Sequence, residues 1–487
     1  MSDRPPGNLN PDSNQDLDTA TAKRSGRTLY ITSIVIGVLI CAYYGATANV
    51  ADPMHLFEGM VILALAMLPG LLWAKGGGRQ LPMFEVLMLT SASTYALPLL
   101  SGRESLRLYP SSLVTYAALT VIAFQATAEM TYYSLKILPG RGPIYSREVI
   151  ISEINRYIGY GLWLTTAYTY VSIYTTWIPY DLNSVLRAVF SGIGLLAVFV
   201  QSRRWGLGVI GNHEKMPFIV NLLLQVILKS STLFLVDAIA MLLIALFGYI
   251  TGSRRLPILA MSIALFALGV LHNGKSLMRE RYWDIEGEGR HYQPALSELP
   301  GFFSEWVECS ANTVPGQSED LHPTSKLLER ASLLHLLCMV EHVTPEKKPF
   351  LDGATYATLY AQFVPRFFWP GKPSGHAATT QMSVYYGLQR VEDTVRTTVG
   401  FGMVVEAYVN FGLPGIVFLG FLLGAVYKFL HGRTKHSPIM SYAGLFTVVL
   451  IAWSIQTEMP LSMWLSSMFQ GCVGVLGVPF LVRHVFG

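Results

Sequence analysis

The chain has 487 residues, of which 52% are hydrophobic and only 14% are charged, and its mean hydropathy is +0.41. Soluble domains carry about 25% charged residues, so this composition excludes an ordinary soluble enzyme and indicates several membrane spans. A net charge of +4 gives no basis for a nucleic-acid-binding surface, and four cysteines exclude a scaffold built on disulfides.

Residues 1–27 are rich in Asp, Asn, Ser and Pro and show no apolar periodicity, which predicts a disordered cytoplasmic tail. Apolar segments long enough to cross a bilayer follow. Twelve spans are predicted: Leu29–Val50, Leu56–Ala74, Phe84–Leu100, Leu113–Leu135, Tyr157–Ile178, Leu182–Gln201, Met216–Ser231, Leu233–Ile250, Leu256–His272, Leu413–Leu430, Ile439–Ile455 and Leu461–Val482.

The stretch from Met216 to Ile250 contains one conspicuous polar run, Lys229–Thr232. As a single helix this stretch would extend over about 50 Å, which is too long for a hydrocarbon core of ~30 Å. We therefore expect a break at the polar run. With that break, Arg254 and Arg433 fall on the same side of the membrane as the N-terminus, as the positive-inside rule requires.

These assignments predict an all-α fold, a polytopic bundle of about 12 transmembrane helices; in a bacterial-type inner membrane its outer face would be the periplasmic face. A membrane domain at 28–273 holds nine spans, a helical segment at 274–400 lies in the periplasm, and a membrane domain at 401–487 holds the last three spans. Apolar residues at helical spacing in Ser325–His342 and in Thr355–Trp369 predict amphipathic helices on or near the membrane within the periplasmic segment.

Basic residues gather in the segments that we place outside. Outer segments usually avoid basic residues, and an anionic lipid headgroup would explain their presence, because Arg and Lys bind phosphate. The alternative is snorkelling or surface ion pairing, for which Glu280 and Asp284 are close in the sequence. The groups are Arg103 with Arg107, Lys275 with Arg279 and Arg281, and Arg366 with Lys372.

Five short motifs in the second half of the chain together carry a resemblance to a known family. They stand at Phe350–Tyr356, at Val364–Pro373, at Glu406–Gly412 with Gly415, at Gly252–Arg255, and at His272–Lys275 with Arg279. Over roughly residues 250–425 the chain resembles oligosaccharide repeat-unit polymerases of the O-antigen polymerase type. The many-span layout of the whole chain is similar to that family as well.

The resemblance implies a membrane glycosyltransferase. It would join repeat units carried on undecaprenyl diphosphate into O-antigen, capsule or exopolysaccharide chains at the periplasmic face. The non-reducing hydroxyl of the acceptor unit would attack the anomeric carbon of the donor chain, and lipid diphosphate would leave. The implied partners are the lipid-linked oligosaccharide, the bilayer, a chain-length regulator and a flippase, with no nucleic acid.

This reaction needs cations for the leaving diphosphate and a base for the acceptor hydroxyl. The catalytic candidates are Arg366, Lys372 and Arg330 as cations, and Glu406 and His335 as bases, with Asp352 as a third base. A structural salt bridge for Glu406, a satisfied interfacial histidine for His335 and a turn at Asp352 stay open as alternatives. Candidates for binding the diphosphate or the glycan are Lys275, Arg279, Arg281, Asp352, Tyr356, Trp369, Arg103 and Arg107.

The periplasmic segment contains no Asp-x-Asp motif of the kind that metal-dependent glycosyltransferases use, so we expect no metal and no cofactor. Cys309 and Cys338 fall in this segment and would either form a disulfide or remain separate thiols.

Three other functions fit the same residues. A ligase would move a finished glycan from the same lipid carrier to another acceptor, and needs a similar diphosphate site. A flippase or transporter would place charged groups near the middle of the membrane. A membrane-embedded peptidase has weaker support, from Cys338 and His335 alone.

Overall fold

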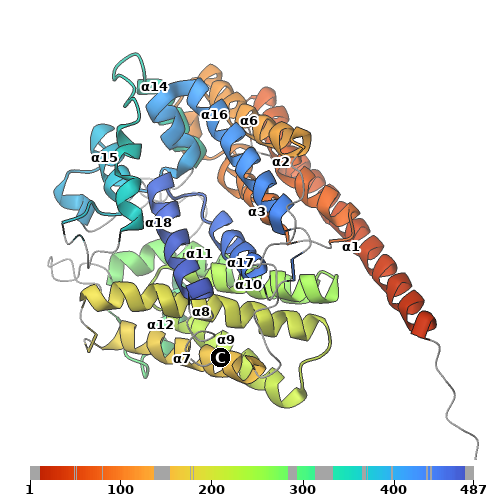
Figure 1. Ribbon diagram of the computed structural model, residues 1–487. Coiled ribbons are helices and arrows are strands. Elements are labelled where there is room, and N and C mark those ends of the chain that lie inside the picture. The colour runs from red at the N-terminus through yellow and green to blue at the C-terminus, as the bar shows by residue number, and fades with distance from the viewer. Residues whose placement is uncertain are drawn as a thin grey trace, which may run out of the picture.

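The computed structural model describes residues 11–48, 50, 52–78, 81–136, 154–175, 177–178, 180–282, 293–312, 333–364, 369, 371–395, 399–434, 437–438 and 441–477. Within these ranges every element is a helix, as Figure 1 shows. The predicted all-α fold is therefore confirmed for the described part of the chain.

The helices of the first half precede the long turn at 254–257. They are α1 (Pro11–Thr47), α2 (Pro53–Lys75), α3 (Met83–Ser91), the π turn η1 (Ala92–Ala96), α4 (Leu97–Leu100), α5 (Glu104–Arg107), α6 (Ser111–Ser134), α7 (Ile154–Tyr174), α8 (Tyr180–Gly206), α9 (Asn212–Ser230) and α10 (Leu235–Ser253). Since α1 starts at Pro11, the helix extends into the tail for which we predict disorder.

The second half contains longer helices joined by short helical turns. They are α11 (Ile258–Tyr282), α12 (Leu299–Asn312), α14 (Leu333–Val343), η3 (Ala354–Thr358), η4 (Tyr360–Phe363), α15 (Ala377–Tyr385), η5 (Glu392–Val395), α16 (Gly402–Thr434), α17 (Tyr442–Ser454), α18 (Leu461–Cys472) and η6 (Val473–Gly477). In Figure 1, α14 and α15 lie at the upper left, while α7, α8 and α9 cross the lower half.

Six of the described helices are long and apolar enough to cross a membrane. They are Arg27–Thr47, Pro53–Lys75, Met83–Leu100, Ser111–Ser134, Ile258–Lys275 and Gly402–Thr434. Each coincides with a predicted span. The described parts of the other six predicted spans lie mostly on helices, namely α7 to α10, α17 and α18, and these helices fall short of the same combination of length and apolar character. The chain is thus a helical protein built to lie in a membrane.

The predicted break near Lys229–Thr232 is confirmed. Helix α9 ends at Ser230 and α10 begins at Leu235. Leu233 turns the chain with a positive φ of 61°, and its carbonyl oxygen accepts a hydrogen bond from Arg279 Nη2 at 2.8 Å. The polar run and a distant arginine therefore fix the turn together.

Two helix pairs pack backbone to backbone through glycines spaced four residues apart. A Cβ at Gly420 or Gly424 of α16 would come within 2.7 Å or 2.4 Å of a carbonyl oxygen of α6. Gly248 and Gly252 of α10 have the same spacing, and a Cβ at either would come within 2.6 Å or 2.4 Å of a carbonyl oxygen of α8. Small residues at this spacing let membrane helices approach closely without a hydrophobic driving force between them.

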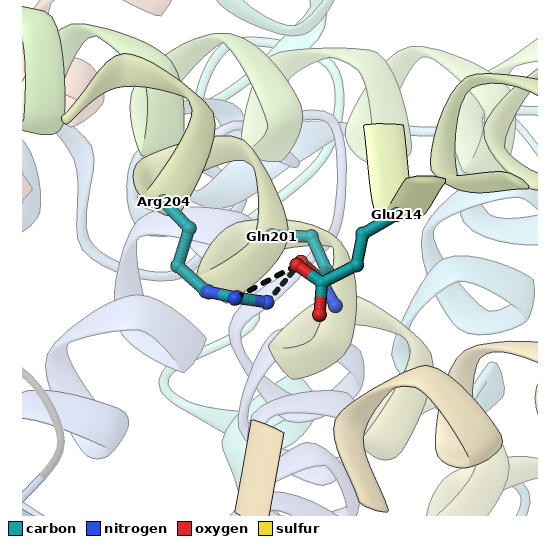
Figure 2. A network of polar contacts seen from close by, with 3 residues as sticks. All are labelled: Gln201, Arg204 and Glu214. Carbon is teal, nitrogen blue, oxygen red and sulfur yellow. Dashed lines mark hydrogen bonds and ion pairs between the residues drawn. The ribbon is translucent and has the colours of Figure 1, made fainter. Parts of the chain in front are cut away.

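A polar network holds the turn between α8 and α9. Figure 2 shows Arg204 donating to Gln201 Oε1 at 3.0 Å and to Glu214 Oε2 at 2.8 Å. The Lys215 ammonium lies 4.7 Å from the Trp205 ring centroid next to this pair. Because the ion pair is partly exposed, it contributes about 1 kcal/mol or less.

Helix α14 is a core element and not a surface helix. Its Leu333, Leu336, Cys338 and Val340 side chains, which point in several directions around the helix, are all fully buried, and it packs against α6 and α16. A helix that is apolar on every side must be buried. In the described part of the predicted helix Thr355–Trp369, two short 3-10 helices, η3 and η4, stand in place of one longer helix.

Candidate functional site

His272, in the second half of α11, lies near three basic side chains. Arg103, from the connection between α4 and α5, lies within electrostatic range of the His272 ring, as do Lys275 and Arg279 of α11. Arg103 and His272 are exposed. We call these four residues the basic cluster.

Arg279 also serves the fold. Its guanidinium donates to the Leu233 carbonyl and lies 5.2 Å from the Phe234 ring centroid. Burial lowers the pKa of Arg279 to about 10, so the group remains a cation at neutral pH. Arg279 therefore anchors the basic cluster to the turn between α9 and α10.

Two other predicted binding residues, Arg281 and Arg107, lie at the surface. Arg281 forms an exposed ion pair with Glu305 of α12 at 2.5 Å, and Tyr282 donates to the same carboxylate. The Tyr282 hydroxyl and Arg281 hold the pKa of Glu305 below its usual value. Arg107 is exposed at the end of α5. The surface ion pairing considered above thus describes Arg281.

Glu458 brings a carboxylate to the basic cluster. It is an exposed residue of the connection between α17 and α18, and its charge interacts with Lys275. Although the residue as a whole is exposed, the surrounding protein keeps part of the water from its carboxyl and so raises the pKa of Glu458. The positive charge of Lys275 partly offsets this effect. Sequence reasoning missed this residue; the available signal was a carboxylate in a short connection between two apolar segments.

Two of the sequence motifs form a single unit. The 350–356 loop lies on the first turns of α16: Leu351 N donates to Val409 O at 3.0 Å, and Gly353 N donates to Asn410 Oδ1 at 3.0 Å. The Tyr356 ring stacks on Phe411 of α16 at a centroid distance of 6.3 Å. The motif at Phe350–Tyr356 and the motif at Glu406–Gly412 therefore work as one surface.

Glu406 lies beneath this surface and is fully buried. Its Oε2 accepts a hydrogen bond from the backbone N–H of Leu461 at 2.6 Å, and Thr355 is a further side-chain partner. Leu461 is the first residue of α18, where a carboxylate is stabilised by the helix dipole. Glu406 thus ties α16, α18 and the 350–356 loop together. It does so through hydrogen bonds to Leu461 N and Thr355, and not through the salt bridge that we considered as an alternative.

The remaining sequence candidates lie elsewhere on the same segment. Lys372 Nζ donates to Val364 O at 2.9 Å and to Ala361 O at 3.4 Å, so it closes the turn after η4. Trp369 stacks on Tyr360. Asp352 is exposed, with a positive φ of 47°, as expected of a turn. Arg330 and Arg366 lie outside the described residues.

His335 and Cys338 are both buried in α14, and the His335 ring lies 5.5 Å from that of Tyr109. Burial raises the pKa of the Cys338 thiol far above its ordinary value, which removes the thiolate that a peptidase nucleophile needs. Cys309 and Cys338 are not joined by a disulfide. Within the described ranges, no three His, Cys, Asp or Glu side chains gather in a way that could hold a metal ion.

The basic cluster and the 350–356 loop are joined through the connection between α17 and α18. Glu458, whose charge faces Lys275, accepts a backbone hydrogen bond from Gly402 N at 2.9 Å. Three residues further, Leu461 N donates to Glu406. Cations, an exposed carboxylate and the motif surface therefore occupy one end of the helical bundle.

The comparisons with known proteins add one match. A family model described as a domain of unknown function, DUF8712, matches residues 235–437. No curated protein and no solved structure matches the chain. The matched range contains α11, the 350–356 loop and Glu406, while Arg103 and Glu458 of the same site lie on either side of it.

Proposed function

We propose that the protein is a membrane polysaccharide polymerase, a glycosyltransferase that joins oligosaccharide repeat units carried on undecaprenyl diphosphate. The observation that carries this proposal is that Arg103, Lys275 and Arg279 lie within electrostatic range of His272, near the end of the candidate membrane span Ile258–Lys275. Such a cluster suits a diphosphate, because Arg binds it through paired donors and Lys as a point charge.

The reaction follows from this placement. The donor glycan is already activated by its diphosphate, so the site has to align two glycans and stabilise the charge that develops on the leaving group. Lys275 and Arg103 would bind the departing diphosphate. The 350–356 loop, held on α16, would form the adjoining wall for the sugars, and Tyr356 would offer an aromatic face there.

The proposed topology has twelve spans with the N-terminus in the cytoplasm of a bacterial cell. In this arrangement the segment at 274–400, the basic cluster and Glu458 all face the periplasm, where lipid-linked repeat units are presented. Chain-length regulator and flippase proteins would then meet the polymerase in the inner membrane.

A flippase or transporter of the same lipid is the second candidate. The observation that favours it is a set of buried carboxylates inside membrane-spanning helices, Glu58, Glu85 and Glu129, since intramembrane charges often mark transport paths. A ligase acting on the same lipid carrier shares the diphosphate site, and the two enzymes differ in the acceptor.

A reconstitution experiment tests the proposal. Purified protein in vesicles receives a lipid-diphosphate-linked repeat unit, with no nucleotide sugar. A ladder of products spaced by one repeat unit supports polymerisation. Transfer to a different acceptor without a ladder favours the ligase, and movement of the lipid across the bilayer without new glycosidic bonds favours the flippase.

Variants of the basic cluster sharpen this experiment. Lys275→Gln should lower ladder formation at least tenfold, whereas Arg281→Gln, which removes a cation held in an exposed pair with Glu305, should leave it unchanged. Equal activity of the two variants would contradict the assignment of the basic cluster to the diphosphate.

A further inference from the structure

The connection between α17 and α18 is held against the start of α16. Glu458 O accepts from Gly402 N at 2.9 Å, and a Cβ at Gly402 would lie 2.8 Å from Thr457 O. A Cβ at Gly400 would likewise lie 3.0 Å from Glu458 O. Because side chains at these two positions would displace the connection, the glycines allow the backbone of Glu458 to occupy a fixed place.

The side chain of Glu458 is unusual for a carboxylate near a cation. It is exposed, and its charge interacts with Lys275. Both residues are described, yet the two charged groups form no ion pair and make no side-chain hydrogen bond. The carboxylate and the ammonium are therefore not committed to each other.

Two other carboxylates near this end of the bundle are committed to the fold, whereas Asp352 is exposed in a turn of the 350–356 loop with no recognised cation beside it among the described contacts. Glu406 is fully buried and bonded to Leu461 N, so it has no surface with which to touch a sugar. Glu305 is held by Arg281 and Tyr282. Glu458 combines exposure, a fixed backbone and a neighbouring cation that could bind the leaving group.

We infer that Glu458 is the general base of the proposed glycosyl transfer, accepting the proton of the acceptor hydroxyl. This inference rests on the proposed polymerase function. The hydroxyl oxygen forms a bond to the anomeric carbon of the donor glycan, and the bond between that carbon and the diphosphate oxygen breaks. Lipid diphosphate leaves with the electron pair beside Lys275, and Glu458 then releases the proton to water.

The test compares Glu458→Gln with Glu346→Gln in the reconstituted full-length protein. Glu346 is an exposed carboxylate in the turn after α14 and is the matched control. We expect Glu458→Gln to lower kcat by about 10²- to 10⁴-fold, the usual contribution of a general base, with KM changed less than threefold. The control should behave as the wild type does.

The pH profile separates a base from a structural residue. The charged group that faces Glu458 from α11 is Lys275; on the side of α16 and α18 the neighbouring carboxylate, Glu406, is bonded to Leu461 N. A base must be ionised to act, so wild-type kcat should fall as the pH drops through the pKa of Glu458. The residual activity of Glu458→Gln should lack that acid limb.

A third variant covers the case in which Glu458→Gln folds poorly. Glu458→Ala is assayed with and without added formate, a small carboxylate that can take the place of the missing base. Recovery of at least tenfold in the ladder with formate supports the inference. No recovery in a variant whose thermal midpoint matches the wild type contradicts it.

The failure of this inference differs from the failure of the proposed function. A wild-type ladder together with full activity of Glu458→Gln would overturn the base assignment and leave the polymerase intact. A large rise in KM with kcat unchanged would also overturn it, because Glu458 would then act in binding. Absence of a ladder from the wild type would contradict the proposed function itself.

Discussion

Asn410 of α16 donates a hydrogen bond from Nδ2 to Thr355 Oγ1 at 2.8 Å, and through Oδ1 it accepts from Gly353 N. One buried amide therefore fastens the 350–356 loop to the helix that carries Glu406. Nδ2 also reaches Glu406 O at 2.8 Å. The amide offers both a donor and an acceptor, and the loop uses both.

The first prediction concerns this amide. Asn410→Ala leaves the Gly353 N–H and the Thr355 hydroxyl without these bonds, so it should cost about 1–3 kcal/mol of stability and detach the loop. The thermal midpoint in detergent should fall by several degrees, and ladder formation should fall with it. Asn212→Ala, at an exposed position of α9, is the control and should change stability by less than about 0.5 kcal/mol.

The second prediction concerns Glu406. If its carboxylate serves as an acceptor for Leu461 N, Glu406→Gln should keep most of the activity, because a glutamine oxygen accepts the same hydrogen bond. Glu406→Ala leaves a buried N–H without an acceptor and should cost about 1–3 kcal/mol. Thermal midpoints and kcat measured for both variants show whether Glu406 stabilises the fold or acts in catalysis. A large loss of kcat in a stable Glu406→Gln protein would return the base role to this residue.

The third prediction concerns the contact between α16 and α6. A Cβ at Gly424 would come within 2.4 Å of Ala128 O, whereas a Cβ at Gly70 of α2 would meet nothing within 4 Å. Gly424→Ala should thus force the helices apart and cost about 1–3 kcal/mol. Gly70→Ala should be neutral or stabilising by up to about 1 kcal/mol, since alanine favours helix. Comparable thermal midpoints for the two variants would show that the close approach contributes little.

Much of the fold could be predicted because apolar length and polar interruptions are local signals. The polar run Lys229–Thr232 marks the break between α9 and α10, and the described part of each predicted span lies mostly on a helix. The burial of α14 could also have been predicted, since Leu333 to Val340 is apolar on nearly every side. Its interpretation as a surface helix gave too much weight to the few charges around it.

The site could be predicted only in part, because it depends on contacts between distant segments. Arg279 and Arg281 are two residues apart and so lie about 200° apart around α11; one joins the basic cluster and the other pairs with Glu305. The spacing alone could not show which of the two arginines joins the basic cluster and which pairs with Glu305. The approach of Arg103 to His272, and of Glu458 to Lys275, joins elements whose packing no local pattern specifies.

The last prediction concerns pH. Glu341 of α14 is buried, and burial raises the pKa of its carboxyl to about 8, from an ordinary value of 4.5. The neighbouring groups are Thr120 of α6, Tyr408 of α16 and Cys338 of α14. Between these two pH values the unfolded chain has lost the proton that the folded protein keeps. The free energy of unfolding should therefore fall as the pH rises from about 4.5 to 8.

Replacing this carboxyl should remove the dependence on pH. Glu341→Gln keeps the shape of the protonated acid, so its thermal midpoint should exceed that of the wild type at pH 8 and should equal it near pH 5. Scans in detergent at both pH values provide the measurement, and Glu346→Gln, exposed in the following turn, should track the wild type at both. An unchanged difference between pH 5 and pH 8 in Glu341→Gln would show that another group is responsible.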